Sequence, residues 1–224
     1  MRPLSRQERP TLTLEQAYRL FESTQDDWLH ALYVVLATTG LRLGEALGLR
    51  WDDVDLSGQT LSIRQALQRQ TGKGQVTVPL KTSKSRRVVP LMKVATDAIR
   101  RHKTRQIQQR LLLSINWPDT SHVFTSETGT LLDQSNVRDR RYYPALKAAG
   151  LPHVRLHDLR HTASTLMASE GIPMHMVQAV LGHARSSTTM DIYTHVLDTS
   201  FQEVRDKMDA AYDRIQLRAA EVAS

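Results

Sequence analysis

The spacing of apolar residues changes sharply in one part of this chain, and that change limits the possible folds more than any other feature. From residue 13 to about residue 50, and over most of the chain after residue 93, apolar residues recur every three or four positions, as in amphipathic helices. Between residues 60 and 91 the spacing falls to two, which is typical of half-buried strands. Three such segments are separated by the turn sequences TGKG and KTSKS: 61–67, 75–80 and 86–91. We therefore predict an α+β fold, mostly α, in which a helical domain carries a small three-stranded antiparallel sheet arranged as a meander.

Helix boundary signals divide the chain into a lead-in, one domain and a tail. Thr13 followed by Gln16 has the spacing of a capping box, and Gly40 is placed to end the next helix in a left-handed conformation. Further helices are predicted at 94–113, 135–150, 157–170, 173–181 and 188–197. We assign residues 1–12 to a linker or lead-in, 13–198 to one globular domain, and 199–224 to a separate tail helix.

Positive charge is concentrated in the region of the predicted sheet. The chain carries 30 Lys and Arg against 23 Asp and Glu. Residues 61–120 hold 13 basic and 2 acidic side chains, whereas residues 1–60 hold 6 and 9. A charge so concentrated in one segment favours a polyanion such as nucleic acid over a mildly basic surface that only keeps the protein in solution.

The composition also excludes several classes of protein. No run of 18 or more apolar residues is present, and the first ten residues lack the apolar stretch of a signal peptide. We therefore expect a cytoplasmic protein without a membrane partner. The absence of cysteine excludes disulfide scaffolds, thiol catalysis and cysteine-ligated metal sites.

The segment RLHDLRHTASTLMASEG places two polar side chains together. On a helix, His157 and Arg160 lie three positions apart on one face, while the apolar side chains occupy another. The two side chains would therefore project together and act at one site. Taken alone, the segment is better explained as an exposed polar stripe on a helix.

A second candidate lies in TTGLRLGEALGLRWDDVDL. Arg42 follows a predicted helix end and is surrounded by leucines, where a guanidinium needs a carboxylate or an anionic ligand. Glu45, three residues on, is placed to orient it.

Five short motifs in this order make the chain resemble the catalytic domain of the tyrosine recombinases, the phage integrase family. The motifs are TGLRLGEAL with Arg42, KTSKSRR with Lys81, HDLRHT with His157 and Arg160, LGH with His183, and MDIYTHV with Tyr193. The resemblance extends over residues 13–198. Members of the family carry a further N-terminal DNA-binding domain, so we expect this chain to be an isolated catalytic domain.

The resemblance implies a DNA strand-transfer reaction that needs no cofactor and no metal. Tyr193 would attack a phosphodiester and form a 3′-phosphotyrosyl intermediate. A tyrosine hydroxyl, with a pKa of about 10, needs a base for this attack, and His157 would take its proton. Arg42 and Arg160 would hold the non-bridging oxygens of the phosphate.

Three supporting roles follow from the same resemblance. Lys81 would protonate the leaving 5′-oxygen, with Lys84 as the alternative. His183 would hydrogen-bond the scissile phosphate, and Glu45 would support Arg42.

The implied partners are double-stranded DNA and three further copies of the chain. We expect a homo-tetramer on DNA and a monomer or weak association without it. Lys84 is also expected to bind DNA. Arg86 and Arg87, at the start of the third predicted strand, are expected to bind DNA phosphates, although charges that guard a strand edge give the same pattern.

The predicted function is a site-specific recombinase or integrase that moves a mobile element. Two other classes stay open: a type IB topoisomerase, which usually lacks a histidine at the position of His157, and a helix-turn-helix regulator without catalytic activity.

The tail carries an apolar stripe of residues spaced three and four apart: Phe201, Val204, Met208, Ala211 and Ile215. The family resemblance favours burial of this stripe against a neighbouring protomer, and the alternative is burial against its own domain.

Overall fold

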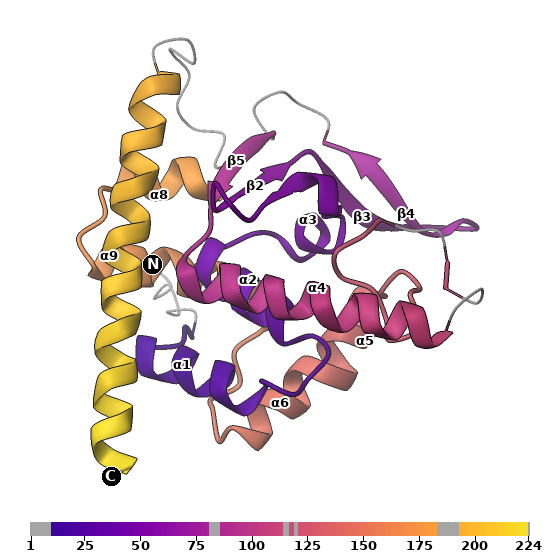
Figure 1. Cartoon of the computed structure of the whole chain (residues 1–224), viewed down its shortest axis with the longest axis horizontal. Helices are drawn as coiled ribbons and strands as arrows, with labels where there is room; N and C mark the ends of the chain where they lie inside the picture. Colours follow the sequence, from indigo (N-terminus) through magenta and orange to yellow (C-terminus); the bar gives the residue numbers. More distant parts are fainter. Residues whose placement is uncertain (1–9, 81–85, 114–116, 119–120, 183–192, 224) are drawn as a thin grey trace, which may run out of the picture.

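A computed structural model describes residues 10–80, 86–113, 117–118, 121–182 and 193–223 of the 224-residue chain. Helices dominate these ranges, and the named strands all lie between residues 54 and 90 (Figure 1). The predicted class, α+β and mostly helical, is confirmed. The described α-helices are α1 (Leu14–Ser23), α2 (His30–Thr39), α3 (Leu43–Leu47), α4 (Lys93–Leu113), α5 (Gln134–Asn136), α6 (Tyr143–Ala148), α7 (Leu159–Ser169), α8 (Met174–Leu181) and α9 (Tyr193–Ala223), and a π-helical segment, Val137–Tyr142, joins α5 to α6.

The helix boundaries that depend on local chemistry are where the sequence predicts them. Thr13 Oγ1 accepts a hydrogen bond from the Gln16 amide at 3.2 Å, and Gln16 Oε1 accepts one from the Thr13 amide at 3.0 Å, so the capping box opens α1. Gly40 ends α2 with φ of 65°, and its amide donates to the Leu36 carbonyl. Every residue of α2 is buried, so this helix forms the centre of the core.

The strands pair differently from the predicted meander. The described strands are β1 (Val54–Asp55), β2 (Thr60–Ile63), β3 (Gln65–Gln70), β4 (Gly74–Pro79) and β5 (Arg87–Pro90). They form two antiparallel sheets, ordered β1-β2-β5 and β3-β4. The predicted strand 61–67 is thus broken at Arg64, and β5 pairs with β2 instead of β4, with Leu61 opposite Val89.

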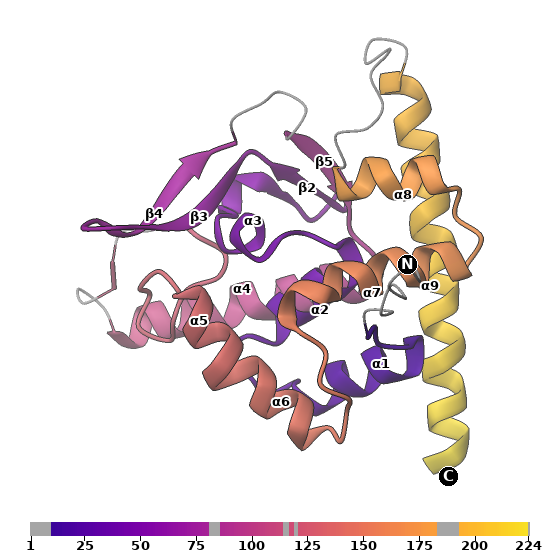
Figure 2. The ribbon, with the colours of Figure 1, turned by 180° about the vertical axis from the view of Figure 1, so that it is seen from behind.

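The break at Arg64 has a tertiary cause. The Gln65 side-chain amide donates to the Gly48 carbonyl at 2.7 Å, and the Gln134 side-chain amide donates to the Leu67 carbonyl at 2.9 Å. These bonds tie β3 to the end of α3 and to α5. Because β3 leaves the line of β2, the β3–β4 pair lies apart from the edge that β5 joins (Figure 2).

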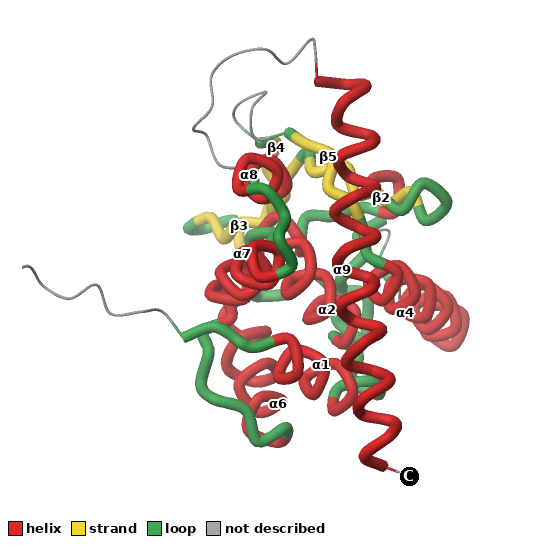
Figure 3. Tube along the Cα trace, turned by 90° about the vertical axis from the view of Figure 1, so that its left-hand side faces the viewer, coloured by secondary structure: helices red, strands yellow, loops and turns green. Residues whose placement is uncertain are grey.

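The C-terminal helix lies along the left-hand side of the molecule in Figure 1, the side that faces the viewer in Figure 3. A single helix, α9, crosses residue 199, where a separate tail helix was expected to begin. Its apolar stripe is buried within this chain: Val204 and Met208 are each 2% exposed and Ala211 is fully buried. The stripe packs on its own domain, where we expected a neighbouring protomer.

Contacts from three elements hold α9 in place. The Tyr212 ring lies 5.6 Å from the Tyr18 ring of α1, and the Asp209 carboxylate accepts a hydrogen bond from the Lys93 amide at the start of α4. Further contacts join α9 to β5. The helix is therefore part of the same packed unit as α1, α4 and β5.

The remaining helices bring distant parts of the sequence to one place. On the face seen in Figure 2, α7 packs on α2 and α8 packs on both α7 and β5. The start of α3, the first turn of α7, the end of α8 and the start of β5 meet there.

Candidate active site

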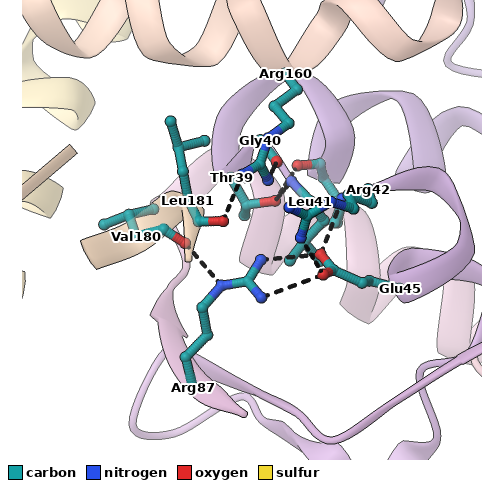
Figure 4. Close-up of polar contacts among 10 residues, drawn as sticks. Thr39, Gly40, Leu41, Arg42, Glu45, Arg87, Arg160, Val180 and Leu181 are labelled. Carbon is teal, nitrogen blue, oxygen red and sulfur yellow. Dashed lines mark hydrogen bonds and ion pairs between the residues drawn. The ribbon is translucent and has the colours of Figure 1, made fainter. Parts of the chain in front are cut away.

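Three arginines and one glutamate form a network where these four elements meet (Figure 4). Arg42 precedes α3, Glu45 lies within α3, Arg87 begins β5, and Arg160 is in the first turn of α7. All four were predicted as site residues: Arg42 and Arg160 as catalytic residues, Glu45 as the support of Arg42, and Arg87 as a DNA contact.

Glu45 is the centre of the network and is 2% exposed. Its Oε1 lies 2.9 Å from Arg42 Nη1, and its Oε2 accepts hydrogen bonds from the Arg42 amide at 3.0 Å and from Arg87 Nη2 at 2.9 Å. Burial by itself would raise the pKa of this carboxyl, but the hydrogen bonds and charge of Arg87 and the hydrogen bonds of Arg42 hold the pKa below its usual value. Glu45 is therefore a carboxylate, and it lies in direct contact with Arg42.

Arg160 is buried, with 6% of its surface exposed. Its Nη1 donates to the Gly40 carbonyl and its Nη2 to the Leu181 carbonyl, both at 2.6 Å. Burial, together with the nearby charges of Arg42 and Arg87, lowers its pKa to about 10. The guanidinium stays charged at neutral pH, and the two carbonyls fix its plane.

Arg42 faces solvent more than its neighbours, with 49% of its side chain exposed. It lines an open groove of about 520 Å³ together with Glu45, His157 and Arg138. His157 is exposed and lies in a 3-10 turn, Leu156–Asp158, that precedes α7. We expected His157 and Arg160 on one face of a single helix; instead the turn carries His157 to the groove beside Arg42.

Sequence reasoning missed the anchor of this turn. Asp158 is completely buried, and its carboxylate accepts hydrogen bonds from Arg155 Nε at 2.6 Å and from Arg155 Nη2 at 3.3 Å. The i, i+3 spacing of an arginine and an aspartate around His157 is the signal that could have identified the pair. Arg138, also missed, carried no signal that separates it from other exposed arginines.

Arg86 and Arg87 have opposite surroundings. Arg86 is exposed, which is compatible with its expected contact to DNA. Only 8% of the Arg87 side chain is exposed, because it binds Glu45 and the Val180 carbonyl. The expected position of Arg87 on the DNA-binding surface is thus corrected: its guanidinium points into the domain.

Lys81, Lys84 and His183 lie outside the described residues. Tyr193 is the first residue of α9, and its side chain is likewise outside the described part of the structure.

The network is suited to binding an anion. Three guanidiniums surround one carboxylate, so the centre keeps an excess of positive charge next to the groove. Among the described residues, no group of three or more His, Asp or Glu side chains is arranged to hold a metal ion. Of the helices in the described ranges, none is both long and apolar enough to cross a bilayer.

Comparisons with known proteins give a consistent picture. A sequence model of the phage integrase family matches residues 10–200. The XerC-like tyrosine recombinase of Caldanaerobacter subterraneus is 33% identical over 199 residues, covering 84% of this chain and 50% of that protein. The ICEBs1 integrase of Bacillus subtilis is 30% identical over 177 residues, covering 79% of this chain and 47% of that protein.

A solved structure has the same fold. The Tn1549 transposon integrase in complex with transposon right end DNA superposes with a TM-score of 0.68 at 22% identity, covering 88% of this chain and 68% of that one. The chain spans about half the length of the curated relatives it matches.

Proposed function

The chain belongs to the phage integrase family of tyrosine recombinases, and from this premise we propose that it cleaves and rejoins DNA strands at specific sites. Residues 13–198 would form the catalytic domain, and the rest of α9 packs against it. The observation that carries the proposal is the pair Arg42 and Arg160, held by Glu45 and by backbone carbonyls beside a groove that contains His157.

The chemistry begins with Tyr193. Its hydroxyl oxygen attacks the phosphorus, its proton passes to His157, and the bond from phosphorus to the 5′-oxygen breaks. Lys81, or Lys84 in its place, gives a proton to that oxygen. The product is a 3′-phosphotyrosyl bond and a free 5′-hydroxyl, and the same steps reversed by a partner strand rejoin the DNA. The phosphodiester energy is kept in the covalent bond, so the reaction consumes no nucleotide.

Arg42 and Arg160 would stabilise the charge that develops on the non-bridging oxygens. Nη1 and Nη2 of Arg160 each donate one hydrogen bond to a backbone carbonyl, so the orientation of the guanidinium is set before DNA binds. Arg42 is tied to Glu45 through Nη1 while half of its side chain stays exposed to the groove. His183 would add a hydrogen bond to the same phosphate.

The partners follow from the same assignment. Double-stranded DNA would bind across the groove, with exposed Arg86 as a phosphate contact, and four copies of the chain would assemble on two DNA sites. The matched relatives that are integrases support a role in moving a mobile element. A protein of this kind would act in the cytoplasm.

A nicked suicide duplex tests the proposal, because loss of a short 5′ fragment after cleavage traps the covalent intermediate. The wild-type protein should form a DNA adduct, and Tyr193→Phe should form none while binding DNA with nearly the same affinity, because it loses a nucleophile and no charge. Tyr18→Phe, on α1, is the matched control and should keep the adduct. An adduct in Tyr193→Phe would refute the assignment.

Strand exchange distinguishes a recombinase from a type IB topoisomerase. Only a recombinase should join strands from two separate duplexes, whereas a topoisomerase should reseal the strand it cleaved. A helix-turn-helix regulator would bind the duplex and form no adduct at all.

A further inference from the structure

We propose that Arg87 is a positioning residue that joins Glu45 to the last turn of α8 and thereby holds Arg42 in position to bind the phosphate. This inference rests on the proposed recombinase function. It concerns a side chain that was expected to contact DNA and that the structure places behind the phosphate-binding arginines.

The contacts of Arg87 use both edges of its guanidinium. On one edge, Nη2 and Nη1 face Glu45 Oε2 and Oε1 at 2.9 and 3.4 Å. On the other, Nε donates to the Val180 carbonyl at 3.0 Å. The planar group therefore bridges α3 and α8 from its own position on β5, which a lysine ammonium cannot do in the same geometry.

The end of α8 is built around this bridge. The carbonyls in the last turn of a helix have no partner within the helix. Here two successive carbonyls are satisfied by different arginines, Val180 by Arg87 and Leu181 by Arg160. Both arginines therefore cap the C-terminal end of α8, which Gly182 terminates in the left-handed conformation.

Gly182 shows how closely Arg87 is packed. It has φ of +70°, and a Cβ at this position would lie 2.8 Å from Arg87 Cδ and 2.9 Å from its Cζ and Nε. A side chain would have to displace the guanidinium. Gly182, which packs against Arg87, directly precedes His183 in the sequence, and His183 is another predicted site residue.

Loss of Arg87 would change Glu45 and, through it, Arg42. The charged groups that face Glu45 within the described residues are Arg42 before α3, Arg87 on β5 and Arg160 on α7. Without Arg87, the buried carboxylate would keep Arg42 as its direct hydrogen-bond partner, and burial would raise its pKa. Arg42 would then be drawn away from the groove, or released when Glu45 takes up a proton.

Single-turnover cleavage of the suicide duplex at saturating DNA tests this role. Arg87→Met should cleave about tenfold more slowly or worse, with a DNA dissociation constant within about twofold of the wild-type value. Arg87→Lys should not restore the rate, because it keeps the charge without the bridge. Arg141→Met, which removes an exposed arginine paired with Glu127, is the matched control and should cleave at the wild-type rate.

A pH profile separates positioning from a general loss of structure. Arg87→Met should show a fall in rate toward acidic pH beyond that of the wild type, as Glu45 becomes protonated. Addition of Glu45→Gln should remove this extra fall, because the double variant has no carboxyl at this position. The double variant should be no slower than the slower single variant, because both changes break the same connection.

Several results would overturn the inference: an unchanged rate at saturating DNA, a loss confined to DNA affinity, full activity in Arg87→Lys, or rate losses that multiply in the double variant. If neither Arg87→Met nor Arg87→Lys melts cooperatively, Arg87 is required for the fold itself and the inference also fails. A wild-type protein that forms no adduct would refute the proposed function itself, which is a separate outcome.

Discussion

Met208→Ala should destabilise the whole domain, because Met208 anchors α9 to the core of its own chain. The Met208 side chain is 2% exposed and lies between Val204 and Ala211 on the buried stripe. Removal of three heavy side-chain atoms from such a position loses apolar burial and leaves a cavity.

The expected loss in the free energy of unfolding is about 3 kcal/mol, within the range of about 2–5 kcal/mol for a buried methionine replaced by alanine. For a domain of this size, that loss lowers the melting temperature by roughly 6–12 °C. Leu217→Ala, on the same helix but 66% exposed, is the matched control and should change stability by less than about 0.5 kcal/mol.

Urea unfolding and thermal melting, followed by far-UV circular dichroism, would measure both variants over a wide range of protein concentration. Since α9 packs in cis, the loss in Met208→Ala should be the same at every concentration. A loss that appears only at high concentration would show that the stripe is buried in an oligomer. Melting of Met208→Ala at the wild-type temperature would refute the burial on which the prediction depends.

Three further outcomes are expected. Burial lowers the pKa of both His30 and His102 to about 4, so between pH 6.5 and 4 the unfolded chain binds protons that the folded chain does not. Urea midpoints should therefore fall over that interval, less steeply in a variant with glutamine at both positions; an equal slope would contradict this account. Gly182→Ala should cost more stability in thermal melts than Gly171→Ala, because both glycines have φ near +70° but only Gly182 has a neighbouring side chain within 3 Å of the added Cβ; equal losses would show that backbone strain alone matters. Lys81→Ala should cleave ordinary DNA slowly and recover on DNA whose bridging 5′-oxygen is replaced by sulfur, since a thiolate leaves without a proton. Equal failure on both substrates would assign the acid to another residue.

Much of the candidate site could be predicted because its motifs are local in sequence. Arg42 and Glu45 lie three residues apart, and their pairing across the first turn of α3 follows from that spacing. His157, by contrast, was assigned to a helix that begins only at Leu159, because a 3-10 turn and the start of an α-helix have similar short-range patterns. The role expected of His157 therefore did not depend on its assignment to a helix.

The sequence by itself determined most of the helices, the caps of α1 and α2 and the mostly helical class, because the interactions responsible join residues within a few positions, as in the capping box of Thr13 and Gln16. Tertiary structure decided which strand β5 pairs with and where the apolar stripe of α9 is buried. It also decided that Arg87 faces Glu45, 42 residues away in sequence, and that Arg160 binds the Gly40 carbonyl, 120 residues away. The physical reason is that an exposed and a buried arginine have the same local sequence pattern. They differ only in whether folding brings a carboxylate or a carbonyl to compensate for the loss of water.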